Sequence, residues 1–325
     1  MKKIFITGGS GYVGSMLVPV LLEKGYSVTV ADLLIYGNTL SPHNKLSINK
    51  VDIRNLKALK KIIPGHDIFI HLACISNDPS FELNPDLGKT INFDCFEPIV
   101  KLCRYSGIKR FVFASSSSVY GIKNVQDVHE EMSLKPLTDY SRFKAECEDI
   151  LQKYNNKNFV TTTIRPATVC GYSTRQRMDV VVNLLTNLAY NKKEISVFGG
   201  EQLRPNIHIS DMVNAYIKVI QSEEKLISGE VFNAGYENKS VNEIAKIVKK
   251  IIGKNVTILK KHSDDNRSYH ISSNKIKKIL GFKSLFTIED AVNDMKNAFE
   301  KNKLINPLTN SNYFNIKKMQ EIKLK

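Results

Sequence analysis

A cluster of glycines directly after a short apolar segment constrains the fold of this chain more than any other feature. Residues 4–6 read Ile-Phe-Ile, which is too short for a helix and typical of a buried parallel strand. Glycines at 8, 9, 11 and 14 follow, and a helical apolar pattern covers 15–24. Bare glycines let a pyrophosphate approach the backbone N–H groups and the positive end of the helix dipole. The candidate dinucleotide contacts here are Gly8, Gly11, Tyr12, Val13 and Gly14.

Acidic residues end the next two strand patterns. The pattern over 27–31 ends in Asp32, at about the ~20-residue offset expected of a dinucleotide-binding fold. A carboxylate there accepts both hydroxyls of the adenosine ribose and repels a 2′-phosphate, so the sequence predicts NAD rather than NADP. A tight turn with an ordinary capping Asp is the alternative. After the third strand pattern, Asp52 with Ile53 either meets the adenine or caps the next helix.

Length and charge limit the classes of protein that remain. The chain of 325 residues can hold one large α/β unit or two domains, and no apolar run approaches a membrane span. The N-terminus lacks a signal pattern and the five cysteines lack metal spacing, so we expect reduced thiols in the cytoplasm and no metal. The net charge of +15 comes without a nucleic-acid motif, so we expect an anionic small molecule rather than a nucleic acid or a membrane as partner.

Strand and helix patterns alternate up to Pro166, which predicts a Rossmann-type, doubly wound parallel sheet with its ligand at the carboxyl ends of the strands. A strand over 67–73 would bring Leu72 and Ala73 against the dinucleotide, and His71 within it is expected to be an interior histidine. We also expect one long helix over 87–105 and a turn over 199–205. The expected parts are an NAD-binding domain over 1–170, a smaller mixed α/β substrate domain over 171–302, partly interleaved with the first, and a basic tail over 303–325, either loop, weak helix or disordered.

Tyr140 and Lys144 are four residues apart on a predicted helix, so they share one face about a turn apart. A tyrosine near pKa ~10 is a poor base at neutral pH, and a nearby ammonium lowers that pKa. The pair can therefore remove a hydroxyl proton while the carbinol hydride moves to nicotinamide. Lys144 can also hold the nicotinamide ribose, and Ser116 can hydrogen-bond the same hydroxyl. A Tyr-x-x-x-Lys spacing alone usually marks a solvated helix face, so the prediction depends on the whole combination.

At this point the chain resembles the extended short-chain dehydrogenase/reductase family, in particular its nucleotide-sugar epimerases and dehydratases. The matching motifs are Thr7-Gly8-x-x-Gly11-x-x-Gly14, Asp32, His71-Leu-Ala, Asn92, Ser115-Ser116 with Val119-Tyr120-Gly121, Tyr140-x-x-x-Lys144, Arg165-Pro166, and Arg204 ahead of His208-x-x-Asp211. The resemblance implies hydride removal from a sugar carbon, usually carbon 4, with tightly held NAD. It also places Ser117, Arg204 and Arg267 at the substrate, the arginines on its diphosphate; two surface arginines are the alternative. Pairing of helices around 90–105 and 141–153, as in relatives, implies a homodimer or higher homo-oligomer.

Departures from the family pattern narrow the predicted reaction. The 4,6-dehydratases carry an acidic residue just after the catalytic Ser or Thr, and Ser117 and Ser118 stand there instead. Oxidation at carbon 4 of a nucleotide-activated sugar remains: a 4-dehydrogenase if the ketone leaves, a 4-epimerase if the ketone takes the hydride back on its other face. Segments 75–80 and 174–179 are similar to the GDP-heptose 4-dehydrogenase branch of capsule biosynthesis, which implies a GDP-sugar. A non-catalytic NAD-binding regulator is the alternative from another class, and it predicts the loss of Tyr140 or Lys144.

Overall fold

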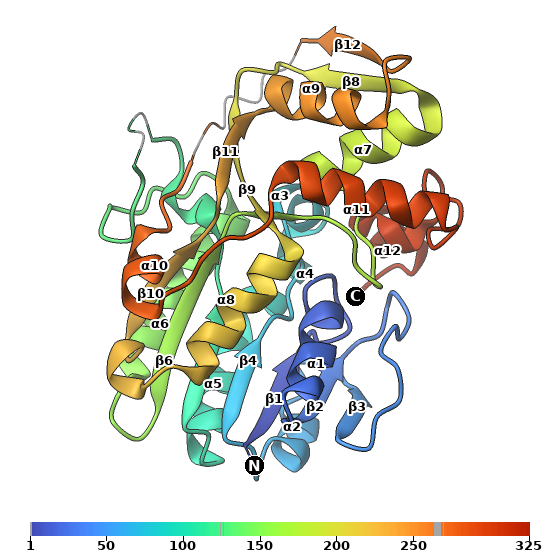
Figure 1. Ribbon diagram of the computed structural model, residues 1–325. Helices are drawn as coiled ribbons and strands as arrows, with labels where there is room; N and C mark the ends of the chain where they lie inside the picture. The colour runs from blue at the N-terminus through green and yellow to red at the C-terminus, as the bar shows by residue number, and fades with distance from the viewer. Residues whose placement is uncertain (1, 124, 126, 263–267, 269) are drawn as a thin grey trace.

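The computed structural model describes residues 2–123, 125, 127–262, 268 and 270–325. Its centre is a seven-stranded parallel sheet with helices on both faces, which confirms the predicted fold class (Figure 1). In spatial order the strands are β10 (Glu230–Ala234), β6 (Val160–Pro166), β5 (Arg110–Ala114), β4 (Ile68–His71), β1 (Lys3–Thr7), β2 (Ser27–Asp32) and β3 (Leu46–Lys50). Within this part of the chain, no helix has the length and apolarity that a membrane span requires.

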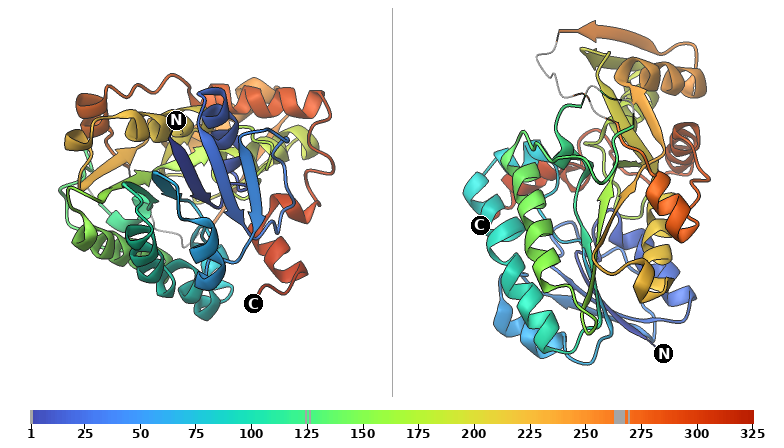
Figure 2. Two further views of the ribbon diagram at one scale, coloured as in Figure 1. Left: turned by 90° about the horizontal axis from the view of Figure 1, so that it is seen from below. Right: turned by 90° about the vertical axis from the view of Figure 1, so that its left-hand side faces the viewer.

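The strands of this sheet alternate their side chains between two cores, as a fully covered sheet requires. Ile4 and Ile6 face one core, while Phe5 and Phe69 face the other. The two helical layers lie on opposite sides of the sheet (Figure 2). The first layer comprises α1 (Gly14–Glu23), α8 (Ile209–Gln221) and α10 (Asn274–Leu280), and the second comprises α2 (Leu56–Ile62), α5 (Phe96–Tyr105) and α6 (Asp139–Tyr154). Burial on both faces therefore fixes the position of the strand ends that carry the site.

The expected long helix over 87–105 is wrong, because the structure divides that segment into three. It contains the end of α4 (Pro85–Lys89), a π-helical turn η1 (Thr90–Asp94), and α5. The Asn92 side chain in the π turn accepts a hydrogen bond from the Ile75 N–H at 2.8 Å and donates one to the Ile75 carbonyl at 2.9 Å. Such turns often lie at functional sites, and this one fixes the chain that follows β4.

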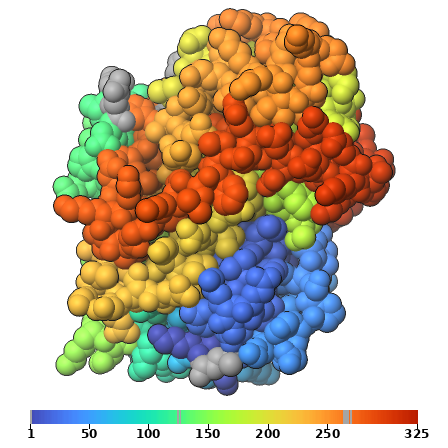
Figure 3. Space-filling model, viewed as in Figure 1, coloured from blue at the N-terminus to red at the C-terminus, as the bar shows by residue number. Residues whose placement is uncertain are grey.

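Two smaller sheets lie beyond the carboxyl ends of the main strands (Figure 1). The segment expected as a turn over 199–205 instead leads into strand β9 (Leu203–His208), which pairs on both sides despite Pro205. In the space-filling view, α11 (Ile288–Glu300) and the chain around it cross the middle of the molecule above α8 and α1 (Figure 3). The elements are β7 (Thr168–Cys170), β9 (Leu203–His208) and β11 (Glu237–Ser240); β8 (Glu194–Phe198) and β12 (Thr257–Lys261); and helices α7 (Val181–Lys192), α9 (Val241–Ile252) and α11 (Ile288–Glu300).

The basic segment over 303–325 is ordered and contains helix α12 (Asn315–Glu321). Asn315 and Met319 of this helix are buried, and Met319 belongs to the same core as Phe5 and Phe69. The loop expected around Asn306 and Asn310 is observed, and the basic end beyond it forms a helix rather than a disordered segment. It returns the end of the described chain to the neighbourhood of β3, far from it in sequence (Figure 2).

Candidate active site

A cavity of about 340 Å³ opens where β1, β2, β4 and β5 end. Every residue predicted to contact the dinucleotide or to move a proton lines this cavity, together with Ser117. These residues are Gly8, Gly11, Tyr12, Val13, Gly14, Asp32, Asp52, Ile53, Leu72, Ala73, Ser116, Ser117, Tyr140 and Lys144. Side chains that the sequence separates by more than a hundred positions thus share one space.

The glycine turn has the close backbone approaches that a nucleotide cradle requires. Gly8 has φ +74°, and a Cβ there would lie 2.6 Å from the Ala73 amide nitrogen. At Gly14 a Cβ would lie 2.6 Å from the Gly8 carbonyl oxygen. The turn can therefore rest against the end of β4 only with glycines at these positions, and it leads directly into the N-terminus of α1.

Asp32 is held by the backbone at the end of β2. Its two carboxylate oxygens accept hydrogen bonds from the Ser10 N–H at 3.0 Å and the Leu34 N–H at 2.8 Å. Burial raises the pKa of Asp32, and these two bonds act against that shift. Its fixed position beside the glycine turn fits the predicted contact with the adenosine ribose.

Asp52 lies further along the same cavity and is paired with Arg54. The Arg54 Nη2–Asp52 Oδ2 distance is 2.6 Å. Burial opposes ionisation of Asp52, but hydrogen bonds from Arg54 lower its pKa overall. The Asp52 carboxylate also accepts a hydrogen bond from the Arg54 backbone N–H at 2.8 Å. Much of its hydrogen-bonding capacity is therefore used by Arg54, and this arrangement is compatible with an adenine contact and with a local structural role.

Helix α6 places Tyr140 and Lys144 on the cavity. Thr138 caps the helix, and its hydroxyl accepts the Ser141 N–H while the Ser141 hydroxyl accepts the Thr138 N–H. Tyr140 is the second residue after the cap, and Lys144 is one turn further on. The Lys144 Nζ donates to the Ala114 carbonyl at 2.6 Å and lies 6.0 Å from the centre of the Tyr140 ring.

The charge that acts on Tyr140 comes from an unexpected residue. The pKa of Tyr140 is raised overall, so the expected lowering is wrong. Burial raises it most, and the charges of Cys74 and Asp78 raise it further. The positive charge of Arg177 and a hydrogen bond with the Ser116 hydroxyl act in the opposite direction. Lys144 was expected to be the cation that lowers this pKa. In the structure the Lys144 ammonium donates to the end of β5 beside the phenol ring, and Arg177 supplies a positive charge that lowers the pKa of the phenol.

His71 is an interior residue, as predicted. It is 3% exposed and shares a 2.8 Å hydrogen bond between its Nδ1 and the Thr7 hydroxyl. Burial, together with the nearby charge of Lys144, lowers the pKa of His71 to about 3. The imidazole therefore stays neutral near pH 7, and His71 is not among the residues that line the cavity.

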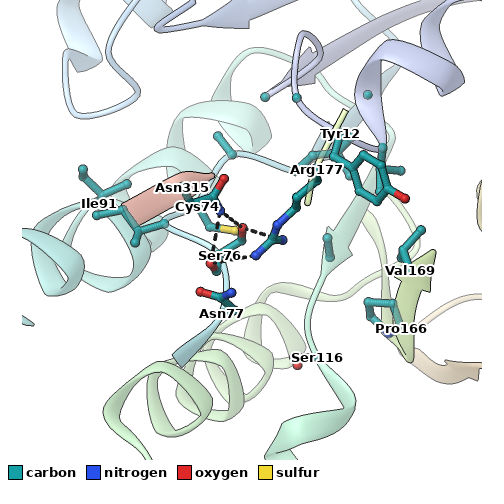
Figure 4. A pocket seen from close by; sticks show the side chains of 18 of the residues that line it. Tyr12, Cys74, Ser76, Asn77, Ile91, Ser116, Pro166, Val169, Arg177 and Asn315 are labelled. Atoms are coloured by element: carbon teal, nitrogen blue, oxygen red, sulfur yellow. Dashed lines mark hydrogen bonds between the residues drawn. The ribbon is translucent and has the colours of Figure 1, made fainter. Parts of the chain in front are cut away.

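Arg177, Ser76 and Asn315, to which the sequence analysis assigned no role, meet on the cavity (Figure 4). Arg177 Nη1 donates to the Ser76 hydroxyl at 3.0 Å, and Asn315 Nδ2 donates to the same hydroxyl at 3.1 Å. Asp179 holds the other side of the guanidinium, with Oδ1 2.6 Å from Nε. The available signal was a pair of arginines, Arg175 and Arg177, in a short loop after a strand. No local pattern indicates Asn315.

The predicted substrate residues are divided between places. Arg204 is half-buried and lines a neighbouring cavity of about 230 Å³. Asn77 and Ser118 line both this cavity and the main one. Arg204 Nη1 donates to the Leu203 carbonyl at 3.0 Å. Arg267 lies outside the described residues. The structure thus puts Arg204 next to the main cavity rather than inside it.

Comparison with known proteins agrees with this geometry. The UDP-glucose 4-epimerase 2 of Arabidopsis thaliana is 28% identical over 335 aligned residues, which cover 93% of this chain and 96% of that protein. The solved UDP-glucose 4-epimerase of Thermotoga maritima with UDP-glucose matches with a TM-score of 0.84 and 24% identity, over 92% of this chain and 99% of that one. The dTDP-glucose 4,6-dehydratase of Streptomyces venezuelae, solved with NAD and TYD bound, matches with a TM-score of 0.85 and 20% identity, over 94% and 100%. The two structural matches show the shared fold.

The family relationship follows from a model that spans the glycine turn, Asp32, α6 and the loop of Arg177. The model of the NAD dependent epimerase/dehydratase family matches residues 4–235, more than half of the chain. This match confirms the resemblance, the enzyme class and the NAD cofactor predicted from sequence. The chain therefore belongs to the NAD dependent epimerase/dehydratase family and is an enzyme that uses NAD.

Proposed function

We propose that this enzyme inverts carbon 4 of a nucleotide-diphosphate sugar by oxidising it to a ketone and reducing the ketone on its other face. One observation carries the proposal: Ser116, Tyr140 and Lys144 line the same cavity as the glycine turn and Asp32. Groups suited to proton transfer and groups suited to holding NAD thus border one continuous space. The retained cofactor would serve both the oxidation and the reduction.

Each side chain of the catalytic group has a role in this reaction. When bound, NAD supplies the acceptor for the hydride that leaves carbon 4. Tyr140 takes the proton of the carbon-4 hydroxyl as the C–H bond breaks, and returns that proton when the ketone is reduced. Ser116 holds the same oxygen through its hydroxyl. Arg177 favours the phenolate that burial disfavours, and Lys144 is placed to hold the nicotinamide ribose.

Dehydration of the sugar is not supported by the residues beside Ser116. Elimination of water would need a further acid and base next to the reacting carbons. Ser117 and Ser118 occupy the positions where the dehydratases that the sequence resembles carry acidic residues. Serine hydroxyls do not titrate near neutral pH, so these two positions supply no acid or base for elimination.

Uridine is the nucleotide that we propose first, because the epimerases most similar to this chain include UDP-glucose 4-epimerases. Arg204 could hold the diphosphate through bidentate hydrogen bonds, with Arg267 as a second candidate from the sequence. The GDP-heptose and the capsule role expected from segments 75–80 and 174–179 have no support among these relatives. The homo-oligomer and the cytoplasmic location remain predictions from the sequence.

Incubation of the purified enzyme with UDP-glucose, UDP-N-acetylglucosamine, UDP-glucuronic acid and GDP-mannose tests the proposal, with products identified by NMR. We expect a UDP-sugar to yield its 4-epimer with no net reduced cofactor. Tyr140→Phe should yield none, whereas Tyr154→Phe, at the far end of the same helix and bonded to Glu97, should remain active. A released ketone with an equivalent of reduced cofactor would identify a 4-dehydrogenase and overturn the proposal.

A further inference from the structure

Arg175 lies in the loop after β7 that is anchored to the glycine turn. The Ser173 hydroxyl donates to the Tyr12 carbonyl at 2.9 Å and shares a 2.8 Å hydrogen bond with the Ser15 hydroxyl. The Arg175 N–H donates to the Ser15 hydroxyl at 3.4 Å, and the Tyr12 hydroxyl donates to the Gly171 carbonyl at 2.7 Å. These contacts hold Arg175 next to the N-terminus of α1, on the cavity that Asp32 and the glycines also line.

The Arg175 guanidinium is buried with part of its hydrogen-bonding capacity unused. The residue is 5% exposed, and its guanidinium carbon lies 3.5 Å from the centre of the Tyr36 ring. Its Nη2 donates to the Asn315 Oδ1 at 2.8 Å. Its Nε is buried and has no hydrogen-bond partner among the described residues. A buried donor on a cavity wall without a partner is unusual and indicates a ligand.

The other buried arginines of the described chain have partners of a kind that Arg175 lacks. Arg110 donates to three backbone carbonyls, those of Val219, Ile220 and Ser222. Arg165 pairs with Glu148 at 2.6 Å, and Arg177 pairs with Asp179 at 2.6 Å. Arg175 forms no ion pair with a described carboxylate, and its hydrogen-bond acceptor is a neutral amide. Burying an unpaired cation is costly, so its retention in the cavity calls for an anionic ligand that completes the site.

We propose that Arg175 binds the pyrophosphate of NAD together with the glycine turn, and that Asn315 is the positioning residue that holds Arg175 there. The pyrophosphate is the anionic part of NAD, and guanidinium groups suit phosphate oxygens because they offer parallel N–H donors. The first half of the site is the N-terminus of α1; the second half comes from a loop more than 150 residues away. This assignment concerns the cofactor and stands whichever sugar the enzyme uses.

Asn315 connects the parts of the chain that surround Arg175. Its Oδ1 accepts from the Tyr36 hydroxyl at 3.0 Å as well as from Arg175, and its backbone N–H donates to Asp179 Oδ2 at 2.9 Å. Its Nδ2 donates to Ser76 at the end of β4. One side chain of α12 thus orients the Arg175 guanidinium and ties the C-terminal helix over the cofactor cavity.

Titration of cofactor-free protein with NAD, ADP, adenosine and NADP tests the role of Arg175. We expect Arg175→Gln to weaken NAD and ADP binding by about 10- to 100-fold, the range for a hydrogen bond to a charged group, and to leave adenosine unchanged. Arg175→Lys should recover part of the loss, and the exposed Arg104→Gln should match wild type. The melting temperature of cofactor-free Arg175→Gln should equal or exceed that of wild type, because a buried charge is removed.

Three results would overturn the assignment. These are unchanged NAD affinity in Arg175→Gln, equal losses for NAD and adenosine, or a loss confined to NADP, which would indicate a 2′-phosphate contact. Should Arg175→Gln fail to fold, Arg175→Lys supplies the same comparison between ADP and adenosine. For Asn315→Ala we expect NAD release about 3- to 10-fold faster, the size of a neutral hydrogen bond, with Asn312→Ala unchanged. Wild-type release in Asn315→Ala would rule out the positioning role.

Discussion

The two ends of the cavity are built in opposite ways. At the catalytic end, Ser116, Tyr140 and Lys144 come from one stretch of chain between β5 and the second turn of α6. At the cofactor end the groups come from distant segments, and the Tyr36–Asn315 hydrogen bond joins residues 279 positions apart. The comparison shows that the chemistry depends on the spacing of Tyr140 and Lys144 along one helix, whereas retention of the cofactor depends on contacts between segments that are distant in sequence.

The largest effect is expected at the catalytic end. Tyr140→Phe removes the proton acceptor, so kcat should fall by about 10³-fold, within the range measured for general acid–base groups. NAD content per protein should stay at the wild-type value, because cofactor contacts elsewhere are intact. Absorbance of the purified protein and NMR of the products measure both quantities. Turnover near the wild-type rate would contradict the assignment of Tyr140.

A substitution at the other end should have the reverse pattern. Asp32→Asn removes the charge that would accept the ribose hydroxyls, so the Kd for NAD should rise by about 10- to 100-fold. At saturating NAD its kcat should remain within a few-fold of wild type. Discrimination against NADP should also weaken, because the charge that repels a 2′-phosphate is gone. Isothermal titration and turnover at high NAD separate these effects, and a large loss of kcat at saturation would break the distinction between the two ends.

Arg177 lies between the two ends, and its effect should be seen in the pH profile. The charge of Arg177 lowers the pKa of Tyr140 against the effect of burial, so Arg177→Gln should raise that pKa. Because the phenolate is the active base, the rise of activity with pH should move to higher pH, with kcat about tenfold lower at neutral pH for each pKa unit. Arg177→Lys keeps the charge and should shift the profile less. An unchanged profile in Arg177→Gln would show that another group sets the pKa.

The smallest effect is expected in helix α12. Met319 is 5% exposed and lines the cavity near Ile53, so Met319→Ala should loosen the helix and raise the Kd for NAD by about threefold, less than a full core truncation would allow. Hydrogen exchange of residues 315–321 should accelerate while that of β1 stays slow. The exposed Gln320→Ala on the same helix is the matched control. Equal protection in both variants would mean that α12 does not depend on this contact.

The same contrast explains what could be predicted from the sequence. The parallel sheet and the Tyr140–Lys144 face could be predicted because buried strands and helices have short sequence periods. Strand β9 was missed because Pro205 argues against a strand, and pairing with β7 and β11 overrides that local signal. The roles of Arg175 and Asn315 depend on which distant segments pack together in the fold. Local sequence periodicity carries no information on that packing.

The fate of the hydride tests the central claim most directly. UDP-glucose deuterated at carbon 4 is incubated with the enzyme, or the corresponding deuterated sugar if another UDP-sugar proves to be the substrate, and the product is examined by mass spectrometry and NMR. The account predicts a 4-epimer that keeps the deuterium at carbon 4, because the hydride leaves and returns within one closed site. Deuterium found in free reduced cofactor or lost to water would contradict it.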